Sequence, residues 1–220
     1  MSIKNVTGLI TNINRLRIDT DGPGVTTLVG MYGCPLKCKY CINANNTRKH
    51  NYTVEELYNA VKIDRIYFDH TGGGICFGGH EPLLQQEFII EFIKYIRGKG
   101  HTWKIGIETS LNVDKYPKEL ISLLDFIICD IKDTNNEIYR EYTGQDNYNV
   151  MVNLKRLLNV TDFSSRALDN EFSIKLRLPL IHGYNTYKDI EKSEKLLEDT
   201  YLFAKYELDK FEYRFGGRES

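Results

Sequence analysis

Long apolar runs, an excess of one charge and internal repeats are all missing from this sequence. No run approaches the roughly 20 apolar residues of a transmembrane helix, and the first ten residues lack the charged and then apolar order of a signal peptide. The 29 basic and 30 acidic residues form no local cluster, which argues against nucleic acids and membrane surfaces as partners. We therefore expect a cytoplasmic monomer, with residues 1–220 forming a single domain.

Cysteine is scarce, and its distribution is uneven. Three of the five cysteines, Cys34, Cys38 and Cys41, share one short stretch with the spacing C-x3-C-x2-C, whereas Cys76 and Cys129 stand alone in apolar segments. This usage suits a reducing compartment rather than a disulfide framework. A ligand set made only of thiolates favours zinc, copper(I) or an iron–sulfur cluster.

The cluster loop, residues 33–43, supplies three ligands, and the fourth position decides the metal. A structural zinc site usually takes a fourth Cys or His, and no second C-x2-C or H-x3-H pair follows at the expected distance. A cubane [4Fe–4S] cluster held by three cysteines fits better, and it leaves one iron open to a small molecule. A structural zinc knuckle and a disulfide pair with a spare thiol are the alternatives.

Strand and helix patterns alternate along the chain. Alternating apolar and polar residues predict an edge hairpin in Val6–Ile18, before a turn at Asp21–Gly24. Further strands are expected at Val25–Met31, Ile66–Phe68, Ile75–Phe77, Trp103–Glu108, Phe126–Asp130, Phe172–Leu178 and Lys210–Phe215. Helices are expected at Val54–Val61 after a capping box of Thr53 and Glu56, and at Gln85–Arg97, Tyr116–Leu124, Thr134–Tyr142, Val150–Leu158 and Tyr187–Lys205. About six parallel βα units follow, which predicts an α/β fold with an incomplete (β/α)6 barrel.

The cysteine triplet, with Tyr40 before its last cysteine, resembles the signature of the radical S-adenosylmethionine (SAM) enzymes. In that family the open iron chelates the methionine part of SAM, so the resemblance implies a [4Fe–4S] cluster and SAM as cofactors, with Tyr40 at the adenine. The turn Asp21–Gly24, the strand after it and Gly33-Cys34 resemble the subgroup that activates glycyl radical enzymes such as pyruvate formate-lyase. The incomplete barrel is also what this resemblance implies.

A second stretch, Thr71–Leu84, places glycines on both sides of a short apolar strand, so that its backbone can approach a ligand closely. It resembles the family's Gly-Gly-Glu-Pro motif, whose backbone meets the amino group of SAM. The matching residues are Gly78, Gly79, His80 and Glu81. His80 departs from the family pattern, and we favour an in-register replacement over an insertion. His80 is then a candidate proton donor or substrate contact, and a histidine that fills space beside the cofactor is the alternative.

Charged residues follow or lie within three of the apolar strands, where a parallel sheet carries its chemistry. They are Glu108, Asp130, Lys132 and Arg177. A surface salt bridge would explain any one of them, but together they indicate a site. In the activases, the Asp-x-Lys segment lies close to SAM and its Asp helps to hold a monovalent cation. The resemblance therefore implies that Asp130, Lys132 and Arg177 contact SAM, and that Asp130 shares a cation with Glu108 and Thr109, which stand in place of Asp-Thr.

The resemblance implies an oxidoreductase that receives one electron from flavodoxin or ferredoxin, cleaves SAM to a 5′-deoxyadenosyl radical and abstracts a hydrogen atom. No insert with further cysteines follows the cluster loop, so we expect a single cluster. The leading substrate is a backbone glycine of a glycyl radical enzyme, with the tyrosines of Tyr139–Tyr148 and His182–Tyr187 either at the docking rim or capping the core. The alternatives are an activase of anaerobic ribonucleotide reductase, an enzyme that modifies a peptide or small molecule, and an iron–sulfur electron carrier.

Overall fold

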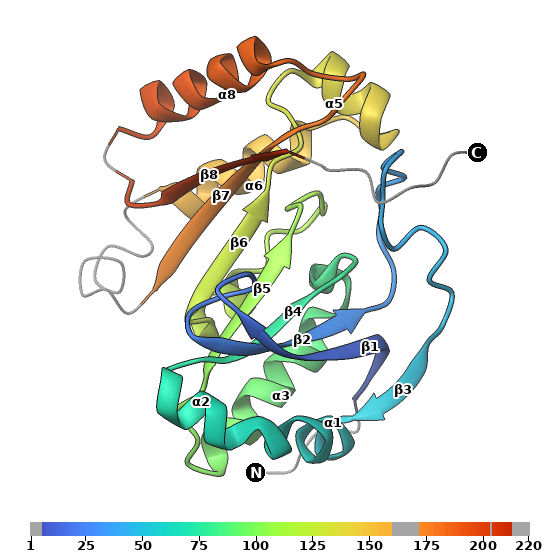
Figure 1. Ribbon diagram of the computed structural model, residues 1–220, viewed down its shortest axis with the longest axis vertical. Helices are drawn as coiled ribbons and strands as arrows, with labels where there is room; N and C mark the ends of the chain where they lie inside the picture. The colour runs from blue at the N-terminus through green and yellow to red at the C-terminus, as the bar shows by residue number, and fades with distance from the viewer. Residues whose placement is uncertain (1–5, 160–171, 203, 213–220) are drawn as a thin grey trace. The chain divides into compact units, whose positions relative to one another are not determined.

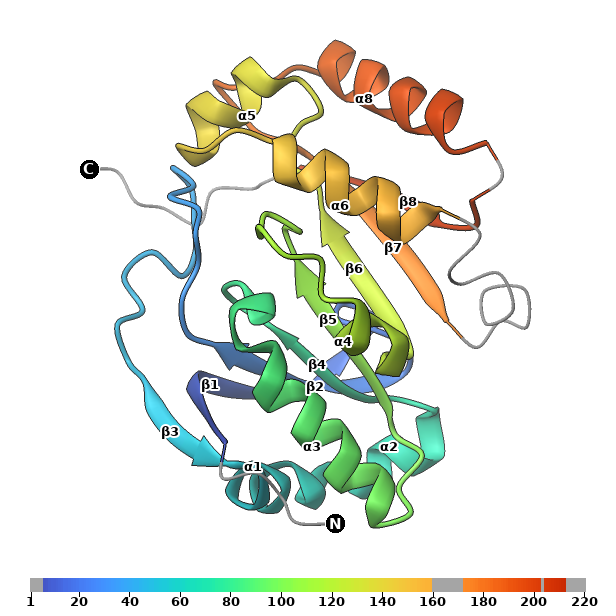
Figure 2. The same ribbon diagram turned by 180° about the vertical axis from the view of Figure 1, so that it is seen from behind.

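The structure is a computed structural model that describes residues 6–159, 172–202 and 204–212 (Figures 1 and 2). Backbone contacts divide the chain into two compact units. The first consists of Met1–Cys34, Asn46–Thr109 and Lys115–Ile128, and the second of Pro35–Asn45, Ser110–Asp114 and Cys129–Ser220. No helix in the described part of the chain has the length and apolar character needed to cross a membrane.

The first unit is built on a sheet whose centre is parallel. β2 (Val25–Met31), β4 (Gly74–Gly78) and β5 (Lys104–Thr109) run parallel, while β1 (Thr7–Ile18) pairs antiparallel with both β2 and β3 (His50–Thr53). The hairpin expected within Val6–Ile18 is therefore a single strand, and it makes its hairpin with β2. The reason is the turn at residues 19–24, which reverses the chain.

Helices α3 (Gln86–Gly98) and α4 (Lys118–Leu123) lie on one face of this sheet, as Figure 2 shows. α1 (Val54–Val61) begins at the expected capping box, in which Thr53 Oγ1 accepts the backbone N–H of Glu56 at 3.2 Å. η1 (Lys62–Asp64) and η2 (Pro82–Gln85) are single 3₁₀ turns. The strand expected at Ile66–Phe68 was wrong, because these residues belong to α2 (Arg65–Thr71) and only Phe68 is buried.

Alternation along the strands separates two apolar layers in the first unit. On the helix side, the ring of Phe77 packs edge-on against Phe92 of α3, with centroids 5.5 Å apart. On the opposite side, a small buried cluster fills the sheet surface below the ends of the strands; it consists of Leu28, Cys76, Phe126 and Ile128. Gly106 has no side chain because a Cβ there would lie 2.3 Å from the ring of Phe126. The ring of Phe126 therefore occupies the space that the missing side chain of Gly106 leaves on this face of the sheet.

The second unit contains β7 (Ser173–Leu180), β8 (Glu207–Glu212), α5 (Asn136–Thr143), α6 (Tyr148–Leu158) and α8 (Tyr187–Thr200). β7 and β8 are parallel, and Figure 1 shows α8 running alongside them. α8 ends five residues earlier than expected, and β8 begins three residues earlier; residues 213–215 of the expected last strand lie outside the described residues.

β6 (Phe126–Asp130) is divided between the two units, with residues 126–128 in the first and 129–130 in the second. Just after it, the Ile131 N–H donates to the Arg177 carbonyl of β7 at 2.9 Å. Hydrogen bonds link the eight strands in the order β3-β1-β2-β4-β5-β6-β7-β8. When the short β3 is left out, the described residues contain six strands from β2 onward, which is the predicted number. The predicted α/β fold is confirmed.

Candidate active site

The cluster loop follows β2 directly and carries three cysteines, none of which forms a disulfide. Cys34 is exposed, and Cys38 and Cys41 are half-buried. The loop docks through its backbone on the carboxyl end of α5, where the Lys37 N–H donates to the Thr143 carbonyl at 2.8 Å and the Lys39 N–H to the Tyr142 carbonyl at 3.1 Å. These bonds satisfy carbonyls that a helix end leaves without an internal partner.

The chemistry of the donor set fits an iron–sulfur cluster. Burial raises the pKa of the Cys38 thiol to about 11, and the Lys132 ammonium acts in the opposite direction. A bound metal removes the proton from a thiol ligand, so the burial of Cys38 does not prevent it from binding a metal as the thiolate. Across the described residues, no three Cys, His, Asp or Glu side chains converge at metal-ligand distance. The fit therefore rests on the number, type and spacing of the three thiols.

Cys76 and Cys129 are fully buried in β4 and β6, as the sequence predicted. None of the five cysteines forms a disulfide.

The glycine turn after β4 is Gly78–Glu81. The His80 N–H donates to the Gly78 carbonyl at 3.0 Å and closes a γ-turn centred on Gly79, whose φ is +82°. A glycine suits this position because a Cβ would meet strain and would lie 3.2 Å from the Cα of Gly30. At Gly78 a Cβ would lie 3.1 Å from the Cβ of Glu108. The turn therefore packs too closely on Gly30 and Glu108 to leave room for a side chain at either glycine.

Two predicted site residues of the first unit bind each other. The buried carboxylate of Glu81 accepts a hydrogen bond from the Thr109 hydroxyl at 2.5 Å and another from the Leu83 N–H at 3.3 Å. Glu81 thereby caps η2 and fixes the end of β5. Glu108 is half-buried beside Gly78.

The second unit brings Asp130 and Lys132 together in a largely buried ion pair. Arg177 of β7 is paired with Asp209 of the neighbouring strand β8, and its Nε lies 3.6 Å from the Asp209 carboxylate. A largely buried ion pair like that of Asp130 and Lys132 holds the ammonium in place, so that it can meet an anionic ligand without reorganising.

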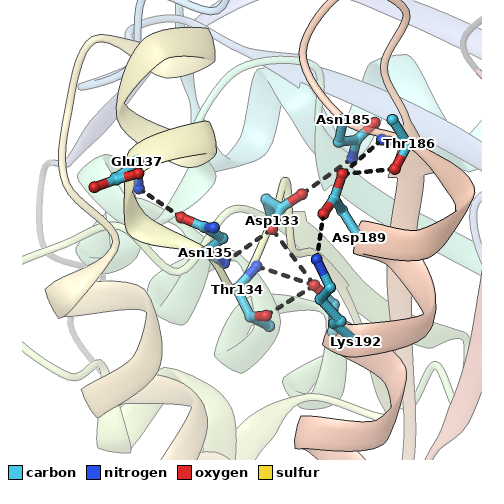
Figure 3. A network of polar contacts seen from close by, with 9 residues as sticks. Asp133, Thr134, Asn135, Glu137, Asn185, Thr186, Asp189 and Lys192 are labelled. Carbon is cyan, nitrogen blue, oxygen red and sulfur yellow. Dashed lines mark hydrogen bonds and ion pairs between the residues drawn. The ribbon is translucent and has the colours of Figure 1, made fainter.

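Sequence reasoning missed a polar network that holds the segment after Lys132 (Figure 3). Asp133 is 2% exposed and accepts hydrogen bonds from the Asn135 N–H at 2.8 Å and from Asn185 Nδ2 at 3.1 Å. Asn185 also donates to the Pro179 carbonyl at 3.0 Å and accepts from the Ile181 N–H at 2.6 Å. Burial raises the pKa of Asp133. The only signal in the sequence was the run Asp133-Thr134-Asn135, which is typical of a turn before a helix.

The tyrosines divide between core and surface. Tyr139 and Tyr142 are 1% exposed, so the expected docking role is wrong for these two, and they cap the core of the second unit instead. Tyr148 and Tyr187 are exposed. Tyr40, the predicted adenine contact, packs edge-on against Tyr184 with centroids 5.7 Å apart.

Comparison with known proteins decides the family. A family model described as the Radical SAM superfamily matches residues 28–197, well over half of the chain. The chain belongs to the radical SAM superfamily. This superfamily uses a [4Fe–4S] cluster and SAM, so the predicted cofactors and the assignment as an enzyme are confirmed. The monovalent cation stays a prediction.

Two relatives illustrate this radical SAM chain's likeness to known activases. The pyruvate formate-lyase-activating enzyme of Clostridium pasteurianum is 29% identical over 228 residues, which cover 95% of this chain and 90% of that protein. That of Staphylococcus aureus (strain USA300) is also 29% identical, over 77% of this chain and 67% of its own length. A solved structure, native anSMEcpe with bound AdoMet, has a TM-score of 0.57 and 19% identity over 86% of this chain and 53% of its own. The structural likeness confirms the partial-barrel fold.

Proposed function

We propose that this radical SAM enzyme is an activase that removes a hydrogen atom from a backbone glycine of a glycyl radical enzyme. The observation that carries the proposal is the likeness to a pyruvate formate-lyase-activating enzyme along nearly the full length of both chains. The four motifs that resemble the activases span most of the chain, which supports the same reading.

The cofactors, when bound and reduced by one electron, supply a 5′-deoxyadenosyl radical; the chain supplies the ligands and the orientation. In the proposal Cys34, Cys38 and Cys41 hold the cluster, and the backbone of Gly78–Glu81 accepts the methionine amine. The remaining SAM contacts are Tyr40 at the adenine, and Asp130, Lys132 and Arg177 at the ribose and carboxylate.

Lys132 is the residue of this set whose surroundings define its task most clearly. Its side chain is 10% exposed and its ammonium is paired with Asp130, so the ammonium is partly dehydrated and held in one place. A charge-assisted bond from such a group to the SAM carboxylate is strong and directional. The network around Asp133 keeps the backbone after Lys132 in position.

A monovalent cation held by Asp130 and by Glu108-Thr109 is part of the proposal. The Thr109 hydroxyl donates its hydrogen to Glu81 and keeps its oxygen lone pairs, which are what a cation would contact. We also propose a monomeric, cytoplasmic enzyme whose electron comes from flavodoxin or ferredoxin.

The test is electron paramagnetic resonance on the anaerobically reconstituted and reduced protein, mixed with SAM and a candidate glycyl radical enzyme. The expected result is a doublet from a glycyl radical on the partner chain. A partner in which the radical glycine is replaced by alanine, and a Cys38→Ala variant of this chain, should both abolish the doublet. Turnover of a free peptide or small molecule at a comparable rate, without a radical on any protein, would reject the activase assignment and leave the radical SAM chemistry intact.

A further inference from the structure

The backbone that leads into the cluster loop is fastened from one side by residues 80–85. The three residues before Cys34 each offer a carbonyl oxygen, and each oxygen accepts one hydrogen bond from this segment. The pairs are Met31 with His80 Nδ1 at 2.9 Å, Tyr32 with Gln85 Nε2 at 3.0 Å, and Gly33 with the Glu81 N–H at 2.9 Å. Three consecutive anchors leave the path of the chain into Cys34 little freedom.

Both polar atoms of the Gln85 side chain, Oε1 and Nε2, form hydrogen bonds in this segment. Its Oε1 accepts the Leu9 N–H at 2.6 Å, and its Nε2 donates to the Leu9 carbonyl at 2.9 Å as well as to Tyr32. The Tyr32 N–H in turn donates to Leu9 at 2.9 Å. Because both N–H groups of the amide donate and its oxygen accepts, a flipped amide would lose all three bonds, and Gln85 therefore has one orientation only.

His80 has its tautomer dictated by the same geometry. A carbonyl oxygen can only accept, so Nδ1 must carry the hydrogen that it gives to Met31. The ring also packs edge-on against Tyr32, with centroids 6.2 Å apart. Within residues 6–159, 172–202 and 204–212, Nε2 makes no hydrogen bond of its own. The nitrogen that does structural work is therefore Nδ1.

We propose that His80 is a positioning residue for Cys34. Through the hydrogen bond of its Nδ1, it fixes the position of the glycine turn relative to the residues that lead into the cluster loop. The proposal rests on the assignment of Cys34 as a cluster ligand. Partners that orient a metal ligand from behind commonly change metal affinity by about 10- to 100-fold when they are removed. A role as a proton donor would instead depend on Nε2.

Two substitutions separate the nitrogens. In Asn the amide nitrogen sits the same number of bonds from Cβ as Nδ1, whereas in Gln it takes the place of Nε2. We expect His80→Asn to retain the iron and sulfide content and the resonance spectrum of the reduced cluster, with and without SAM. We expect His80→Gln to weaken iron binding by about tenfold or more. Circular dichroism of both apoproteins checks that they fold alike.

Any other pattern overturns the proposal. Retention in His80→Gln with loss in His80→Asn would assign the role to Nε2, and no loss in either variant would leave His80 as a space-filling residue. Nitrogen NMR of the histidine rings in the wild-type apoprotein adds a readout that needs no variant, because Nδ1 of His80 must appear protonated. A Cys34→Ala variant that still holds a full cluster would show that the ligand assignment, and not the hydrogen bond, had failed.

Discussion

Replacing Asn185 by Asp exchanges the side-chain amide nitrogen for an oxygen of similar size. A hydrogen-bond donor in the network around Asp133 thereby becomes an acceptor. The Asn185 amide nitrogen donates to Asp133 at 3.1 Å and to the Pro179 carbonyl at 3.0 Å. A carboxylate there would face another carboxylate and a carbonyl oxygen. Rotation of the side chain does not relieve this contact, because its other oxygen is held by the Ile181 N–H, which donates to Asn185 Oδ1 at 2.6 Å. Asn185 and Asp133 are both less than a tenth exposed, so water cannot relieve the contact.

The folded variant can either keep both carboxylates charged or keep one of them protonated. The response that costs less free energy sets the loss of stability. Two carboxylates at this separation repel by roughly 5 kcal/mol at an effective dielectric constant of about 20. Keeping one proton at pH 7 costs about 4 kcal/mol, because an unfolded carboxyl has a pKa of about 3.9. The folded variant should therefore hold one extra proton and lose about 4 kcal/mol of unfolding free energy at pH 7. The raised folded pKa means that this loss is absent below about pH 4 and grows by about 1.4 kcal/mol per pH unit above it.

Urea unfolding of the apoprotein between pH 5 and pH 7 measures both the loss and its slope. The matched control is Asn149→Asp, because Asn149 also donates to a carboxylate, Asp114, at 3.0 Å, but at an exposed position. We expect the control to cost under about 1 kcal/mol with little dependence on pH. Equal losses for the two variants, or a flat pH profile for Asn185→Asp, would refute the buried contact with Asp133.

Other predictions test the site itself. Cys38→Ala should abolish binding of iron and sulfide on anaerobic reconstitution, whereas Cys76→Ala should leave about four irons per chain; stoichiometric zinc without a cluster would contradict this. Lys132→Ala should weaken SAM binding by about 1.5–3 kcal/mol in equilibrium titration, and an unchanged dissociation constant would remove Lys132 from the site. Thr109→Val should lower the unfolding free energy by about 1.5–3 kcal/mol because the Glu81 carboxylate loses a donor, and Thr109→Ser should restore it.

Sequence patterns predicted the strands and helices of this protein that are determined by residues adjacent in the chain. The strands Val25–Met31 and Phe126–Asp130 were expected with the bounds observed, because a buried parallel strand is a short apolar run between breakers. The same template failed at Ile66–Phe68, where three apolar residues also fit a short strand. Ile66 is 58% exposed, so its hydrophobicity gives no information about a buried sheet.

Contacts between distant residues could not be read in this way. Asp133 and Asn185 are 52 residues apart, and neither residue type has a periodic signal that points to the other. His80 was singled out because it interrupts a motif, but only the distance to the Met31 carbonyl shows which ring nitrogen is engaged. The motif located the residue, and the fold determined its bonding.

The docking of the cluster loop on α5 has a consequence for how this stretch can vary between related proteins. The hydrogen bonds to the helix end come from the main-chain amides of residues 37 and 39, so they do not depend on the identities of these two side chains. They do depend on the spacing, since a single inserted or deleted residue would turn the amides away from the Thr143 and Tyr142 carbonyls and rotate Cys38 with them. Selection should therefore act on the length of this loop more strictly than on its composition outside the cysteines.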